Sequence, residues 1–152
     1  YEIGSGLVGS EMCIRDSTTY NGFEYHKGSE INIAVTDFML VLGHTWEIKD
    51  NTYRIEDVKV FFVEKGTAIE MYQTTLHLSP CRVSDIGFKD VVILPRGTNT
   101  PLNNGGADEA AIGEERLLLQ KNKWVIAHPD REPLIKQGAY PGLLGENKKL
   151  YY

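Results

Sequence analysis

Short apolar runs, broken by Gly, Pro, Asn and Asp, follow one another along the chain from residue 18 onward. Runs of this length, several of them alternating apolar with polar positions, are typical of β-strands that have two different faces. The run at 58–64 is the clearest, because it is rich in Val and Phe. The strands that we predict are Gly22–His26, Glu30–Val35, Phe38–Gly43, Tyr53–Ile55, Val58–Glu64, Ala68–Tyr72, Thr75–Cys81, Asp90–Leu94 and Trp124–His128.

One helix is predicted in the second half of the chain, at Ala107–Gln120, although Gly113 interrupts it. The following segment, Pro129 to Gly145, carries Pro and Gly and is expected to wrap the surface. No internal repeat and no clear linker divides the sequence. Many closely spaced strands with little helix therefore predict a single all-β domain, either a sandwich or a barrel.

The first seventeen residues, YEIGSGLVGSEMCIRDS, show neither helical nor strand periodicity. They also lack the basic start and the sustained apolar stretch of a signal peptide. The stretch Leu7 to Asp16 resembles a translation of the transposon-end adapter used to prepare sequencing libraries. We therefore expect residues 1–17 to be a non-native segment and residues 18–152 to form the domain, which leaves open what the natural N-terminus contributes.

Composition and charge narrow the class of protein. With 152 residues, of which 41% are apolar, the chain is long enough for one domain with a core. The formal net charge of −5 gives no electrostatic reason to expect nucleic acid as a partner, since phosphate binding needs a basic face. No apolar run approaches the roughly 20 residues that cross a membrane. Two cysteines cannot form a disulfide framework, so we expect a cytoplasmic protein.

Two histidines and two glutamates carry the candidate chemistry. Glu24 and His26 are two positions apart on a predicted strand, so both side chains point to the same face. Glu30 follows after a stretch that allows a turn, and His77 lies on a later strand. Imidazole and carboxylate donors suit Mn²⁺, Zn²⁺, Fe²⁺ or Ni²⁺. Glu70 stands between two apolar residues and could be a ligand, a general base or an exposed residue at a barrel rim.

The spacing Glu24-x-His26-x3-Glu30 resembles the first motif of the cupin superfamily, in which a histidine usually stands at the position of Glu24. His77 resembles the single histidine of the second cupin motif, although the Pro-x-Gly that usually precedes it is missing. Longer segments, EYHKGSEINI and GTAIEMYQTTLHLSPC, resemble an uncharacterised bacterial cupin family. The resemblance implies a cupin-like antiparallel β-barrel (a double-stranded β-helix, or jelly roll). It also implies a divalent metal ion held by Glu24, His26, Glu30 and His77.

The same resemblance implies a function. Cupin sugar isomerases suggest a metal-dependent isomerase or epimerase of small ketoses or aldoses that works through an enediolate, with Mn²⁺ as the first choice of metal. Glu70 or Glu24 would then move the proton. Two alternatives stay open: a cupin lyase acting on a ureido- or uronate-like acid, with Arg82 or Arg96 as a carboxylate clamp, and a sugar-binding cupin without catalysis. The expected partners are a small sugar and, as in many cupins, a second copy of the chain in a homodimer, with neither nucleic acid nor membrane.

Overall fold

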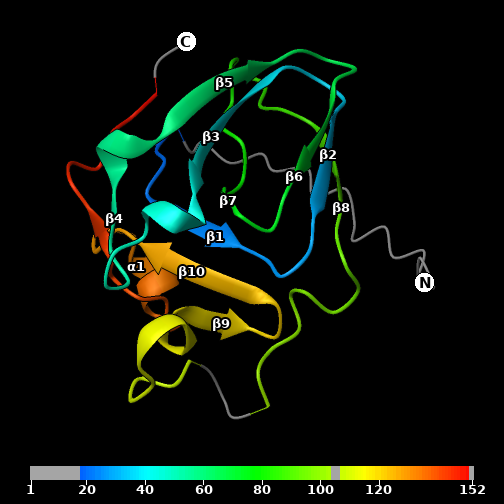
Figure 1. Cartoon of the computed structure of the whole chain (residues 1–152). Helices are drawn as coiled ribbons and strands as arrows, with labels where there is room; N and C mark the ends of the chain where they lie inside the picture. Colours follow the sequence, from blue (N-terminus) through cyan, green and yellow to red (C-terminus); the bar gives the residue numbers. More distant parts are fainter. Residues whose placement is uncertain (1–17, 104–106, 151–152) are drawn as a thin grey trace.

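A computed structural model describes residues 18–103 and 107–150, and these residues form short strands with very little helix (Figure 1). The segment 1–17, interpreted above as a translated adapter, lies outside the described residues. The strands are β1 Gly22–Tyr25, β2 Glu30–Ala34, β3 Phe38–His44, β4 Tyr53–Arg54, β5 Lys59–Val63, β6 Ala68–Met71, β7 Thr75–Leu76, β8 Asp90–Ile93, β9 Leu118–Gln120, β10 Lys123–Ala127 and β11 Leu143–Leu144. The helical turns are η1 Thr45–Glu47, η2 Ile55–Asp57, η3 Gly113–Leu117 and α1 Glu132–Ile135.

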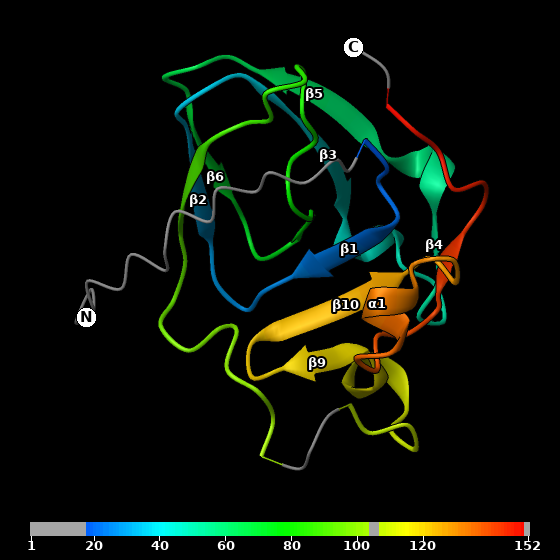
Figure 2. The same ribbon diagram turned by 180° about the vertical axis from the view of Figure 1, so that it is seen from behind.

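Three antiparallel sheets make up most of the fold, in the strand orders β1-β10-β9, β6-β2-β8 and β5-β3-β7. A two-residue parallel pair, β11-β4, lies beside them. The ribbon seen from both sides shows the sheets curving around a common interior (Figures 1 and 2). The prediction of an all-β fold with little helix is confirmed, whereas the barrel is not closed.

Every predicted strand overlaps an observed one, but the predicted helix at Ala107–Gln120 is wrong. Within the described part of that segment the chain forms only the turn η3 and then strand β9. Gly113 has a φ of 59°, in the left-handed region that an α-helix does not use. The residues that follow pair with β10, where Leu118 lies opposite Trp124. Strand pairing therefore decides the structure of this segment.

Two of the three apolar clusters in the described residues lie on the two faces of β3. The first gathers around β1 and β3 and contains Phe23, Tyr25, Val41 and Tyr53. The second lies on the other face of β3, where Phe38 and Leu40 pack together with Met71 and Phe88. Strand β3 therefore contributes side chains to both clusters. No helix in the described residues is long and apolar enough to span a membrane.

Candidate metal centre

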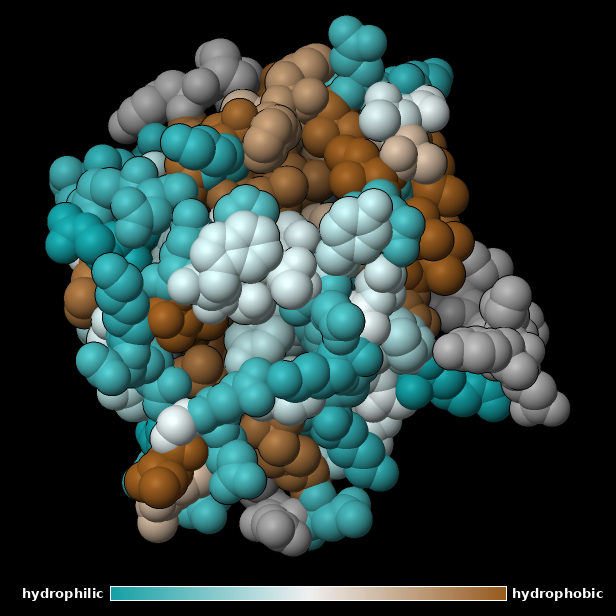
Figure 3. Space-filling model, in the orientation of Figure 1, coloured by the Kyte–Doolittle hydropathy of each residue, from teal (hydrophilic) through white to brown (hydrophobic). Residues whose placement is uncertain are grey.

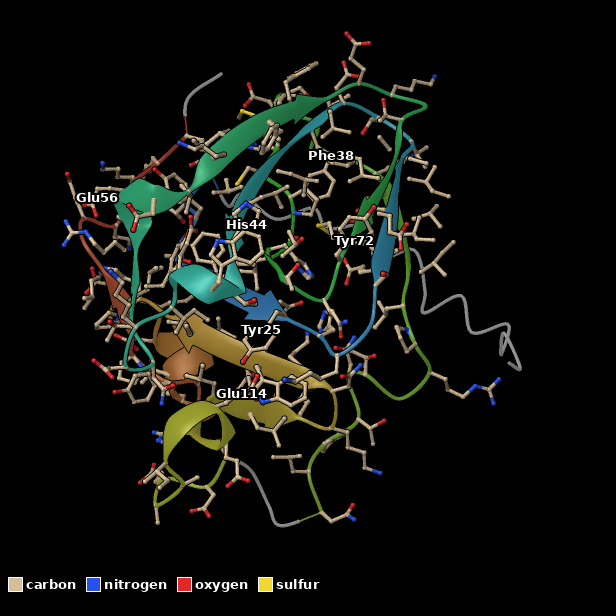
Figure 4. All side chains as sticks on the ribbon, in the orientation of Figure 1. Tyr25, Phe38, His44, Glu56, Tyr72 and Glu114 are labelled. Carbon is tan, nitrogen blue, oxygen red and sulfur yellow. The ribbon has the colours of Figure 1, made fainter. Side chains whose placement is uncertain are left out.

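Strand β1 gives the site its orientation. Phe23 and Tyr25 of this strand belong to the first apolar cluster. The side chain of Tyr25 points toward η3, where its hydroxyl donates a hydrogen bond to Glu114 at 2.8 Å (Figure 4). Successive side chains of a strand point to opposite faces, so Glu24 projects to the other side of β1. His26 follows the end of the strand and lies on the same side as Glu24.

Two further contacts bring the remaining residues to this side. His77 forms an isolated antiparallel bridge with Glu24, in which each main-chain N–H donates to the carbonyl of the other residue. Glu30 begins β2 opposite Met71, and both residues are buried. The ligand atoms of Glu24, His26, Glu30 and His77 all lie within 4.8 Å of one another. The structure therefore brings together the four residues that the sequence predicted as metal ligands.

The distances in the cluster match those between ligands of one ion. The Nε2 atom of His26 lies 3.6 Å from an oxygen of Glu24 and 3.4 Å from an oxygen of Glu30. The Nε2 atom of His77 lies 3.5 Å from the same Glu30 oxygen. Bonds of about 2.1 Å arranged tetrahedrally around an ion separate the ligand atoms by about 3.4 Å. The four side chains thus surround a position where a first-row divalent ion fits.

The two histidines present free nitrogen atoms to this position. The Nδ1 atom of His26 lies 2.8 Å from the carbonyl oxygen of Asn122, and that of His77 lies 2.9 Å from the carbonyl oxygen of Thr75. Each Nδ1–H can donate to its carbonyl, which leaves the lone pair on Nε2. Both Nε2 atoms are buried and have no hydrogen-bond partner among the described residues. Buried nitrogen atoms without partners are costly, and a metal ion would satisfy both of them.

Neighbouring side chains fix the two carboxylates. The side-chain amide of Asn32 donates to one oxygen of Glu30 at 2.7 Å, while the other Glu30 oxygen faces both histidines. The ammonium group of Lys123 lies 3.0 Å from one oxygen of Glu24, and the other Glu24 oxygen faces His26. Each carboxylate therefore directs one oxygen to the common centre. Fixed orientations of this kind are typical of metal ligands with supporting partners around them.

The electrostatics of the cluster keep both carboxylates ionised. Burial alone would raise the pKa of Glu24, but the contact with His26 and the charge of Lys123 together lower it to about 2. The pKa of Glu30 is also lowered, because its close contacts with the two histidines outweigh the effect of burial. Burial would lower the pKa of His26, whereas the adjacent Glu24 and Glu30 raise it to about 9. Both carboxylates are therefore ionised, and a divalent ion that binds here would displace the proton of His26.

Glu70 does not belong to the cluster, and its predicted role as a ligand or general base is corrected. Glu70 lies on β6 opposite Ile31, and both side chains are exposed. The neighbouring pair, Met71 and Glu30, points inward instead. Strand alternation thus places Glu70 on the outer face of the sheet. The third possibility weighed for Glu70, an exposed position, is the one observed.

A pocket of about 330 Å³ adjoins the cluster and includes Glu24, His26 and Glu30 in its wall. Pockets that hold small molecules in proteins begin at about 300 Å³. Apolar side chains such as Leu78 and Leu94 line part of the pocket, and Lys123 and Arg131 supply positive charge. The two arginines proposed from the sequence as a carboxylate clamp, Arg82 and Arg96, are not among the residues that line it.

Asp90 is a pocket residue that the sequence reasoning did not single out. It begins β8, lines the pocket and is only 6% exposed, and within the described part of the chain neither of its carboxylate oxygens has a hydrogen-bond partner. Burial, together with the negative charge of Glu30, raises the pKa of Asp90 to about 6. The sequence signal was weak, because a lone aspartate at the start of a predicted strand is usually a solvated turn residue.

Fold and site together define an all-β protein with a buried two-histidine, two-glutamate cluster beside a pocket. The family with which the sequence agrees is described as a domain of unknown function (DUF4867), and its model matches residues 7–148. The chain belongs to this family. The match begins within residues 1–17, the segment that resembles a translated adapter. No curated protein and no solved structure matches the chain.

Proposed function

We propose that the protein is a metal-dependent isomerase or epimerase of small sugars. One observation carries the proposal: two buried imidazole nitrogens without partners among the described residues converge with two ionised carboxylates beside a pocket. A divalent ion bound here would satisfy both nitrogens, and the adjoining pocket would accommodate a small molecule next to the ion. The cupin resemblance of the sequence supports sugar isomerisation in particular.

The donor set decides the class of metal ion. Two neutral imidazoles and two carboxylates form a borderline-hard site, for which Mn²⁺ is our first choice and Zn²⁺, Fe²⁺ and Ni²⁺ are the alternatives. When bound, the ion would act as a Lewis acid toward the carbonyl and hydroxyl oxygens of an open-chain sugar and so stabilise the enediolate. Glu24, His26, Glu30 and His77 would hold it.

A proton must leave one carbon of the sugar and return either to the neighbouring carbon or to the other face of the same carbon. One oxygen of Glu24 contacts Lys123 and the other contacts His26. These contacts favour Glu24 as a metal ligand rather than as the general base. We assign the transfer of the proton to Asp90, because it lines the same pocket and its carboxylate oxygens have no partner. The ammonium group of Lys123 would donate to a sugar oxygen, since it lies beside Glu24 at the pocket wall.

A lyase that acts on a ureido- or uronate-like acid is the second candidate. Such a substrate needs a cationic partner for its carboxylate. Arg131 and Lys123 line the pocket and could supply that partner, a role first considered for Arg82 and Arg96. A sugar-binding protein without catalysis uses the same pocket and is the third candidate.

The test is exchange of carbon-bound hydrogen with solvent. The Mn²⁺-loaded protein is incubated in D₂O with a panel of aldoses, ketoses and uronates, and products are followed by NMR. The proposal predicts a new sugar carrying deuterium at the reacting carbon, and Asp90→Asn should keep the metal but slow this step by a factor on the order of 10² or more. Elimination from an acid substrate would favour the lyase. Metal-loaded protein that binds sugars without any turnover would favour the binding protein.

A further inference from the structure

The turn between strands β9 and β10 lies beside the candidate metal centre. β9 ends at Gln120 and β10 begins at Lys123, so only Lys121 and Asn122 join the two strands. Lys121 is exposed and Asn122 is half-buried. The turn belongs to the lower, more hydrophilic part of the molecule, below the hydrophobic residues that gather over β5 and β3 (Figures 1 and 3). Contacts of its polar groups are therefore expected to decide its orientation.

Each of the four polar atoms of Asn122 has a partner outside the hairpin. Its carbonyl oxygen lies 2.8 Å from Nδ1 of His26, and its side-chain oxygen accepts the main-chain N–H of Lys27 at 2.9 Å. Its side-chain amide donates to the hydroxyl of Thr98 at 3.2 Å, and its main-chain N–H donates to the Thr98 carbonyl at 3.3 Å. Because Lys27 directly follows His26, Asn122 contacts the same short segment at two neighbouring points.

Thr98 fixes a loop that forms part of the pocket wall. It is 1% exposed, and its hydroxyl donates to the carbonyl of Pro95 at 2.7 Å. The next residue, Asn99, is exposed and lines the pocket. Asparagine side chains in turns commonly bond to the main chain of their own turn. Both side-chain partners of Asn122 lie in other segments instead, so Asn122 connects the pocket loop with a candidate metal ligand.

We propose that Asn122 is a positioning residue of the metal centre, whose side chain fixes the carbonyl that orients His26. The side-chain hydrogen bonds with Lys27 and Thr98 hold the turn against the end of β1. The carbonyl of Asn122 then stays in place to accept the Nδ1–H of His26, and Nε2 points to the other three ligands. The inference rests on the proposed metal centre but does not depend on the reaction.

The second histidine provides an internal reference. The Nδ1 atom of His77 lies 2.9 Å from the carbonyl oxygen of Thr75, which is two residues earlier in the same segment. The four contacts of Asn122 described above do not include this segment. Loss of the Asn122 side chain should therefore release His26 and leave His77 in its orientation, whereas a general loosening of the protein would affect both rings.

The experiment compares Asn122→Ala with the wild type by two measurements. The dissociation constant for Mn²⁺, from calorimetry, should rise by a factor of about 10 to 100 in the variant. NMR of ¹⁵N-labelled protein, metal-free and loaded with Zn²⁺, follows the exchange of the ring N–H protons with solvent. The Nδ1–H of His26 should exchange about tenfold faster in Asn122→Ala, a factor within the range of one or two lost hydrogen bonds. The Nδ1–H of His77 should exchange at the wild-type rate.

Two further variants separate positioning from general stability. Asn122→Asp keeps the acceptor for the Lys27 N–H but loses the donor to Thr98, so both measurements should fall between wild type and Asn122→Ala. The matched control is Asn51→Ala, which removes a side-chain hydrogen bond to the carbonyl of Gly113 at 2.7 Å. It should change neither the affinity for Mn²⁺ nor either ring proton.

Three results would overturn the role of Asn122: a His26 ring proton that is unaffected in Asn122→Ala, equal acceleration at both histidines, or an unchanged affinity for Mn²⁺. A wild-type protein that binds no divalent ion would refute the metal centre itself. The exchange of the His26 ring proton in metal-free protein would still show whether Asn122 holds this side chain. The two failures are therefore distinguishable.

Discussion

Glu24 and His77 face each other across an antiparallel bridge in which the Glu24 N–H donates to the His77 carbonyl at 2.6 Å and the His77 N–H donates to the Glu24 carbonyl at 3.0 Å. This pair of hydrogen bonds joins the end of β7 to the middle of β1. Two residues distant in the sequence therefore present their side chains to the same centre. The main chain, rather than any bound group, holds the candidate ligands together.

The first prediction separates His77 from Glu70. His77→Ala removes a ligand that no neighbouring side chain can replace, so the bound Mn²⁺ should fall to less than about a tenth of the wild-type amount under dialysis. Glu70→Gln is the matched control, because this exposed residue lies on the outer face of β6. It should keep the full metal content. Elemental analysis of both variants checks the prediction, and equal loss of metal in the two would contradict the assignment.

The second prediction concerns Asn32, which donates to Glu30 and does not itself belong to the four-residue cluster. Asn32→Leu keeps a similar volume in a buried position but leaves one Glu30 oxygen without its donor. Partners of this kind typically contribute a factor of about 10 to 100 to metal affinity. The dissociation constant for Mn²⁺, measured by calorimetry, should rise by that factor, whereas Asn99→Leu at the exposed part of the pocket wall should leave it unchanged.

The strands and the four candidate ligands could be predicted from the sequence because both depend on local patterns. Alternation along Gly22–His26 put Glu24 and His26 on one side, and this side proved to be the one that faces His77. The position of Glu70 could not be predicted in the same way. Its side of β6 is set by the pairing of Glu30 with Met71, which is a contact between distant strands. Alternation gives two faces but does not say which of them is inside.

The position of Asp90 in the pocket wall could not be predicted for a related reason. A single aspartate at the start of a strand becomes notable only when its surroundings are known, here a pocket wall beside Glu30. The helix expected at Ala107–Gln120 failed because pairing of β9 with β10 outweighs the helical propensity of isolated residues. Errors of both kinds come from contacts that no local pattern encodes.

The third prediction follows from the buried carboxyl of Asp90. Its pKa of about 6 lies above the ordinary 3.8, so the folded metal-free protein binds this proton more tightly than the unfolded chain does. The contribution of Asp90 to stability is therefore fully present below about pH 4 and is lost as the pH rises through about 6. Asp90→Asn should raise the free energy of unfolding at pH 7 by on the order of 2 to 3 kcal/mol.

Urea unfolding of metal-free protein at two pH values checks this expectation. The difference between Asp90→Asn and the wild type should be present at about pH 7 and should disappear at about pH 4, where the carboxyl is protonated in both states. The conservative variant Asp85→Asn, at an exposed aspartate, serves as control and should show no comparable change with pH. If Asp90→Asn is instead less stable than the wild type at pH 7, the charged Asp90 carboxylate has a stabilising partner and the prediction is wrong.

The central claim is that one divalent ion is bound by His26 and His77 together with the two glutamates. Its most direct test is pulsed electron paramagnetic resonance on the full chain, stripped with a chelator and reloaded with Mn²⁺. The account predicts one tightly bound Mn²⁺ per chain with coupling to two imidazole nitrogens, and loss of one of these couplings in His26→Gln. A folded wild-type protein whose bound Mn²⁺ shows no nitrogen coupling, or that binds no divalent ion at all, would contradict it.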